Sequence, residues 1–161
     1  FHSHHYTASY MQDAESDHSL ISPRDVSPEL TKHFRALRMW LPLQMHGTGP
    51  FIACLKEKLL LTQYVRTRLA DEGFKTGPEP DLSVTYFWYP SKTIDEDTYN
   101  QKLLELIHKD GGVFLSSTRI NGKFVIRVAI LSFRTRLKTI HRALEIIINS
   151  RINLERHFNY K

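Results

Sequence analysis

The dipeptide Asn121-Gly122 lies between the apolar runs "GVFLSSTRI" and "KFVIRVAIL", and it constrains the fold of this chain more than any other stretch. Asn-Gly readily adopts the positive backbone angles of the tight turn that joins two antiparallel strands. The flanking runs are rich in apolar and β-branched residues, which favour extended backbone. The carboxyl-terminal half of the chain is therefore predicted to contain a β-hairpin.

The patterns around this hairpin predict one more strand and two helices. The run "LSVTYFWYP" is typical of a strand, and helices are expected over residues 95–109 and 136–154. From Phe74 onward the predicted order is strand, helix, strand, strand, helix, which indicates a small antiparallel sheet with helices packed against it. The residues expected in the core of these helices are Leu103, Leu104, Ile107, Ile140, Leu144, Ile148 and Ile152.

Two long helices are predicted before this region. In "SPELTKHFRALRMWLPLQMHG", Ser27 suits the N-cap and Pro28 the first helical position, and Pro42 is expected to kink the helix. A second helix is predicted over residues 50–71. Its side chains expected to face a core are Phe51, Ile52, Leu55 and Leu59.

The composition limits the function classes. At 161 residues, 41% hydrophobic and 24% charged, the chain is long enough for one ordinary domain with a core. The net charge is +5, but Lys and Arg are scattered, so no nucleic-acid partner is expected. No apolar run approaches the about 20 residues that cross a bilayer, so no membrane partner is expected. Cys54 is the single cysteine, which indicates a reducing compartment and cytoplasmic localisation.

Arg127 is the one charged residue in the apolar run of the second hairpin strand. Side chains alternate along a strand, so Phe124 and Ile126 share one face and Arg127 lies on the other. Two interpretations stay open: the second face is half exposed and Arg127 reaches solvent, or an anionic ligand meets it. Periodicity alone favours the first. The hydroxyls of Ser116 and Ser117 have no visible base partner, and the histidines of "FHSHH" complete no metal-ligand set, so no metal is expected.

Several segments resemble the pyridoxal-phosphate (PLP)-dependent group II amino-acid decarboxylases, the family of aromatic-amino-acid and glutamate decarboxylases. "FRALRMW" is similar to a family helix with the pattern Phe-Arg-x-Leu-Lys-x-Trp, and "ASYMQD" to the family's mobile catalytic loop. "HSLISPRD" resembles the segment after that loop, and "GKFVIRVAILSFRT" the hairpin strand with a Phe-x-x-Arg core. These segments follow the family's order along essentially the whole chain.

The resemblance implies an α/β fold class, as the carboxyl-terminal part of a fold-type-I PLP enzyme. Residues 1–27 would end the large domain and carry the catalytic loop, residues 28–73 would form the long connecting helices, and residues 74–161 would form an α+β small domain. No segment with the family's PLP-binding lysine is visible in the chain. The resemblance therefore implies a fragment whose cofactor is bound mainly by an upstream part, and which is inactive alone.

The resemblance also implies site residues and partners. Tyr10 would be the loop tyrosine that donates a proton to the substrate carbon after carbon dioxide leaves, with Tyr6 as the competing assignment. Arg127 would meet a substrate carboxylate. The expected partners are an amino-acid substrate, the remainder of the same polypeptide and a second subunit in a homodimer.

A different class of function remains open at this point. The chain would then be a non-catalytic α+β interaction domain whose basic helix, residues 28–46, binds an acidic partner around Arg35 and Arg38. A His-x-x-Lys segment shortly upstream of Phe1 would favour the enzyme.

Overall fold

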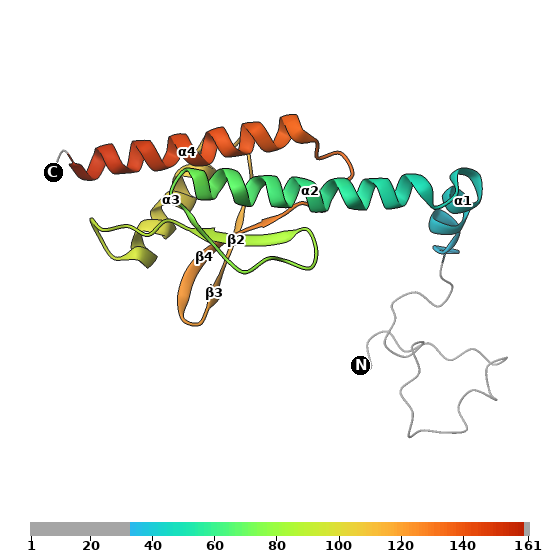
Figure 1. Cartoon of the computed structure of the whole chain (residues 1–161), viewed down its shortest axis with the longest axis horizontal. Coiled ribbons are helices and arrows are strands. Elements are labelled where there is room, and N and C mark those ends of the chain that lie inside the picture. The colour runs from blue at the N-terminus through green and yellow to red at the C-terminus, as the bar shows by residue number, and fades with distance from the viewer. Residues whose placement is uncertain (1–32, 160–161) are drawn as a thin grey trace, which may run out of the picture. The chain divides into compact units, whose positions relative to one another are not determined.

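The computed structural model describes residues 33–159, which belong to two compact units, residues 1–47 and 48–161. In the first unit the described part contains one helix, α1 (Leu37–His46). The second unit contains three helices and a four-stranded sheet (Figure 1). The predicted domain boundaries after residues 27 and 73 stay predictions. No helix within residues 33–159 is both long and apolar enough to span a membrane.

The sheet of the second unit is antiparallel throughout, with the strand order β1-β2-β4-β3. Its strands are β1 (Lys75–Thr76), β2 (Val84–Trp88), β3 (Ser116–Ile120) and β4 (Lys123–Ala129). The predicted hairpin is confirmed: β3 pairs with β4, and both turn residues, Asn121 (φ 51°) and Gly122 (φ 81°), have positive φ. The two-residue β1 was not predicted, because so short a strand carries no alternation to detect.

The helices of this unit are α2 (Gly49–Asp71), α3 (Glu96–Asp110) and α4 (Leu137–Asn159). Figure 1 shows α2 and α4 side by side over the sheet, and the two helices are in contact. Asp95 caps α3, because its carboxylate accepts a hydrogen bond from the Thr98 backbone N–H at 2.9 Å. Gly111 ends α3 in the left-handed conformation that favours glycine (φ 76°).

One face of the sheet carries the core. Phe87 of β2 and Ile126 of β4 are paired in register and fully buried, whereas Arg127 and Ala129 on the opposite face are exposed. The helices therefore pack on this face. The opposite face, called the open face below, carries the exposed Arg127 and Ala129, although Val125 on it is buried. The helical residues buried against the sheet include Leu61, Val65, Leu69, Leu103, Leu104, Ile107, Ile140, Leu144, Ile147 and Leu154.

The prediction for the core-facing side of α2 is wrong. The helix has the predicted extent, but its buried residues lie in its second half and are Lys58, Leu61, Thr62, Val65 and Leu69. The predicted residues Phe51, Ile52, Leu55 and Leu59 are 40%, 49%, 66% and 37% exposed. Residues 49–57 contain no buried residue, and the residues of α2 that belong to the core cluster are Leu61, Val65 and Leu69.

The helix α1 starts later than the sequence pattern predicts. Ser27 and Pro28 lie outside the described residues, and His33–Ala36 precede the helix, which begins at Leu37. The helix continues through Pro42 to His46. Taken by itself, α1 buries none of its residues.

Two matched substitutions in α2 test which part of this helix packs on the core. We expect Leu69→Ala to lower the free energy of unfolding of the 161-residue chain by about 2–5 kcal/mol, because Leu69 is fully buried. Leu55→Ala in the same chain should change it by no more than about 0.5 kcal/mol. Urea unfolding followed by circular dichroism measures both, and a larger cost at Leu55 than at Leu69 would contradict the packing described here.

Candidate functional site

The open face of the sheet is centred on Arg127 in the middle of β4. Tyr86 of β2 and Ser116 of β3 are its direct partners in the two ladders. Residues opposite each other in antiparallel strands project from the same face, so these three side chains share the open face. The sheet thus places a cation, a phenol ring and a hydroxyl together on its uncovered side.

Arg127 is exposed, and within residues 33–159 its side chain makes one hydrogen bond, from Nε to the Ser116 Oγ at 2.9 Å. Among the described residues, no carboxylate forms an ion pair with it. The Ser116 contact could not be predicted from the residues alone, because only the register of β3 against β4 brings residues 116 and 127 together. Arg127 thus reaches solvent from its strand, and its predicted contact with a substrate carboxylate stays a prediction.

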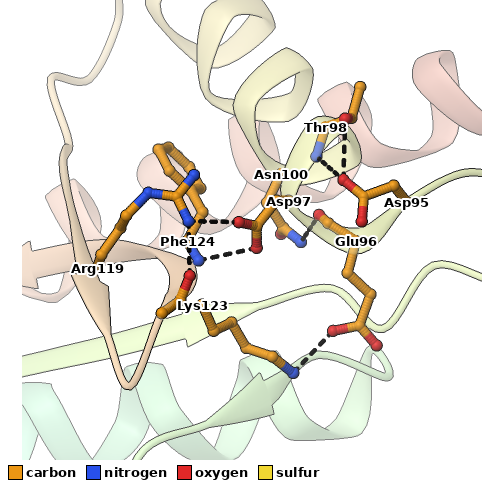
Figure 2. Close-up of polar contacts among 9 residues, drawn as sticks. Asp95, Glu96, Asp97, Thr98, Asn100, Arg119, Lys123 and Phe124 are labelled. Carbon is orange, nitrogen blue, oxygen red and sulfur yellow. Dashed lines mark hydrogen bonds and ion pairs between the residues drawn. The ribbon is translucent and has the colours of Figure 1, made fainter.

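Asp97 in the first turn of α3 holds the hairpin that carries Arg127. Its carboxylate accepts hydrogen bonds from the Phe124 backbone N–H at 2.9 Å and from Arg119 Nη1 at 2.6 Å. Arg119 lies on β3 and Phe124 on β4, so one carboxylate binds both strands. Figure 2 shows these contacts beside the ion pair of Lys123 Nζ with Glu96 Oε2, at 2.8 Å.

Asn100, one turn further along α3, binds the end of β2. Its side chain is fully buried, accepts a hydrogen bond from the Tyr89 N–H at 2.7 Å and donates to the Tyr89 carbonyl at 3.0 Å. It also donates to the Glu96 carbonyl at 2.7 Å, as Figure 2 shows. The start of α3 therefore binds β4, which carries Arg127, and the chain just after β2, one of the two strands that flank β4.

The pKa of the Asp97 carboxyl is lowered from its ordinary value of 3.8. The main cause is the hydrogen bond from the Phe124 N–H, and Arg119 lowers it further, while partial burial acts in the opposite direction. The folded protein thus favours the ionised form.

Other predicted residues have structural contacts or lie outside the described part. Tyr10 and Tyr6 fall outside residues 33–159, so their assignment stays a prediction. Cys54 is a free, half-buried thiol on α2. His141 of α4 has its Nε2 3.1 Å from the Tyr64 hydroxyl. Within the described residues, no three His, Cys, Asp or Glu side chains are arranged to hold a metal ion.

A second cluster of buried charge braces α4 and lies away from the open face. The Tyr89 hydroxyl donates to Glu155 Oε1 at 2.7 Å, and Arg151 forms ion pairs with Glu155 and with Glu72 of the α2 end. Burial and the Glu155 hydrogen bond raise the pKa of Tyr89. These contacts join α4 to the end of α2 and to the chain after β2, although the buried Arg151 Nε has no hydrogen-bond partner among the described residues.

The described lysines offer no site for PLP. A Schiff-base lysine needs an enclosed pocket that holds the cofactor. Lys58 is buried, but its Nζ already donates to Glu57 and to the Thr135 carbonyl at 2.5 Å. Lys123 is half-buried between Glu96 and the Trp88 ring, and the other described lysines are exposed.

The comparisons with known proteins agree on one group of enzymes. No protein-family model matches the chain. The chain is 30% identical over 132 residues to the aromatic-L-amino-acid decarboxylase of Bacillus atrophaeus, which covers 78% of this chain and 28% of the relative. It is 25% identical over 146 residues to tyrosine decarboxylase 2 of Arabidopsis thaliana, which covers 88% of this chain and 27% of that protein. The chain thus spans less than a third of the curated relatives it matches.

Solved structures show the same likeness. Oryza sativa TDC, crystallised with PLP and tryptamine, superposes with a TM-score of 0.72 at 19% identity, over 78% of this chain and 28% of that one. The resemblance to the group II decarboxylases is confirmed. Rhodiola rosea 4-hydroxyphenylacetaldehyde synthase also superposes, with a TM-score of 0.72 at 18% identity, over 83% of this chain and 30% of that one. The predicted fold class, which matches the carboxyl-terminal domain of the group II decarboxylases, is confirmed as well.

The lowered pKa of Asp97 predicts how the hairpin junction depends on pH. The ionised carboxylate stabilises the fold above the unfolded-state pKa near 3.8, and this contribution is lost as pH falls through the lower folded-state pKa. We therefore expect the protein to be more stable than its Asp97→Asn variant at pH 6, with the difference shrinking below about pH 4.

Thermal unfolding from pH 7 to pH 3 measures the difference. Asp81→Asn, at an exposed carboxylate, is the control and should change stability by no more than about 0.5 kcal/mol. A stability difference for Asp97→Asn that is the same at pH 6 and pH 3 would show that the carboxylate charge plays no part in the junction.

Proposed function

We propose that this chain is the carboxyl-terminal part of a PLP-dependent L-amino-acid decarboxylase, a lyase that releases carbon dioxide and an amine. The observation that carries the proposal is the agreement between sequence relatives and fold neighbours on the group II decarboxylases. The alternative of a non-catalytic domain that binds an acidic partner through residues 28–46 receives no support from these comparisons.

The remainder of the polypeptide would supply the PLP site, including its lysine. The exposed apolar residues on the first half of α2 support the proposal that a further part of the polypeptide packs here, because large exposed apolar patches usually mark contact surfaces. The part that binds PLP would cover this patch. A homodimer and cytoplasmic localisation belong to the same proposal, and the single free cysteine, Cys54, is compatible with a reducing compartment.

Arg127 would bind a carboxylate of the amino-acid substrate in the intact enzyme. A guanidinium group presents parallel N–H donors that match the two oxygens of a carboxylate. The exposure of Arg127 on the uncovered face, with no carboxylate paired to it among the described residues, supports this role.

Tyr10 would be the proton donor to the substrate carbon once carbon dioxide has left. A phenol is a neutral acid at neutral pH, and a loop that closes over the site can bring it into place while excluding water. PLP, when bound, supplies the electron sink that decarboxylation needs.

Substitution of the two loop tyrosines tests the proposed activity. In the intact enzyme with PLP, in air-saturated buffer, Tyr10→Phe should lower amine formation by a factor of about 100 or more, because the proton donor is lost. It should raise the aldehyde by-product, with dissolved oxygen as the two-electron oxidant and ammonia as the released nitrogen. Tyr6→Phe is the matched control and should leave amine formation within about twofold of the unmodified enzyme.

Chromatography after reaction with L-tyrosine and L-tryptophan measures the amounts of amine and aldehyde that each variant forms. Unchanged amine formation in Tyr10→Phe would reject its assignment, and loss in Tyr6→Phe alone would transfer the role to Tyr6.

A further inference from the structure

Ser116 is placed to orient the guanidinium of Arg127. The two residues are direct partners in the β3–β4 ladder, and the Ser116 Oγ accepts a hydrogen bond from Arg127 Nε at 2.9 Å. Nε is the inner donor of the guanidinium group. When a hydroxyl occupies it, the outer edge with the two terminal nitrogens stays available for a bidentate carboxylate.

Within the described residues, Arg127 is not neutralised by a carboxylate in the way that Arg119 and Arg151 are. Arg119 pairs with Asp97, and Arg151 pairs with Glu72 and Glu155, so carboxylates neutralise both. In the same part of the chain Arg66 also binds only neutral oxygens, the Thr85 hydroxyl and the Gly77 carbonyl, but these occupy its two terminal nitrogens. The Ser116 hydroxyl restrains Arg127 without adding a negative charge. The full positive charge of Arg127 is therefore kept for an anion from outside this part of the chain.

The other flanking residue, Tyr86, leaves room beside Arg127. A Cβ at Gly77 would lie only 2.3 Å from the Tyr86 ring, so the ring packs closely over this glycine. Gly77 directly follows β1, and β1 pairs with β2 on the side away from β4. The Tyr86 ring thus leans away from Arg127, and Ser116 is the residue that contacts the guanidinium.

We propose that Ser116 is a positioning residue that holds Arg127 by its Nε so that the two terminal nitrogens face the open side of the sheet and bind the substrate carboxylate. This inference rests on the proposed role of Arg127 in the decarboxylase. It predicts that loss of the Ser116 hydroxyl weakens substrate binding through Arg127 and leaves the chemical step intact.

The test compares Ser116→Thr with Ser116→Val in the intact enzyme with PLP, because these side chains have nearly the same shape and differ in the hydroxyl. With L-tyrosine, L-tryptophan and L-glutamate as probes, Ser116→Val should raise KM about 5- to 10-fold with kcat within about twofold, a loss within the range of one net hydrogen bond. The KM and kcat of Ser116→Thr should both stay within about twofold of those of the unmodified enzyme. Ser117→Ala, on the opposite face of β3, is a further control and should change neither.

Arg127→Gln separates failure of this inference from failure of the proposed function. It should raise KM by more than the Val variant does, and Ser116→Val should add nothing further in the Arg127→Gln background. If Arg127→Gln raises KM but Ser116→Val and Ser116→Thr have the same KM and kcat, the role of Ser116 is overturned and that of Arg127 stands. If Arg127→Gln leaves KM unchanged, the carboxylate-binding role of Arg127 is overturned and this inference with it, while the decarboxylase assignment stands. If the unmodified enzyme decarboxylates none of L-tyrosine, L-tryptophan and L-glutamate, the proposed function itself fails.

A measurement without turnover gives a second check. The Nε–H proton of Arg127 should exchange with solvent more slowly in the unmodified protein and in Ser116→Thr than in Ser116→Val, because the hydroxyl protects it. Equal exchange rates of the Nε–H proton in all three proteins would show that the hydrogen bond does not hold the guanidinium. That result would overturn the inference even if Ser116→Val lowers the stability of the protein.

Discussion

The Asp97 carboxylate joins α3 to the β3–β4 hairpin, and the placement of Arg127 depends on this junction. It accepts one hydrogen bond from the backbone of β4 and one from an arginine of β3, so a single side chain fixes both strands against the helix. Asn100 then ties the same helix to the chain after β2. Arg127 lies on the strand between β2 and β3, and its neighbours on both sides are consequently set by the first turns of α3.

Local signals were sufficient for most of this fold. Asn121-Gly122 marks the turn whatever surrounds it, and Asp95 and Gly111 mark the ends of α3, because caps and turns depend on only a few adjacent residues. The side of α2 that packs was not predictable in the same way. Periodicity shows that Leu55 and Leu59 form an apolar stripe, but only the tertiary structure shows that this unit covers Leu61 to Leu69 instead.

The residues of the site also differ in whether the sequence alone can predict them. Arg127 is visible in the sequence because a charge interrupts an apolar strand, and its alternation places it on the open face. Ser116 is eleven residues away and becomes its partner only through the hairpin register, and the lean of Tyr86 depends on the missing side chain of Gly77. Neither the spacing nor the geometry of Arg127, Ser116 and Tyr86 indicates a function. Only the likeness to the group II decarboxylases suggests one.

Release of labelled carbon dioxide is the measurement that tests the decarboxylase assignment most directly. The intact protein that contains this chain, supplied with PLP, is incubated with L-tyrosine, L-tryptophan or L-glutamate labelled with ¹³C at the α-carboxyl carbon, and the gas and the amine are quantified. The assignment predicts labelled carbon dioxide and the matching amine in equal amounts from at least one of the three. Retention of the label in every amino acid, or its appearance in a keto acid, would contradict it.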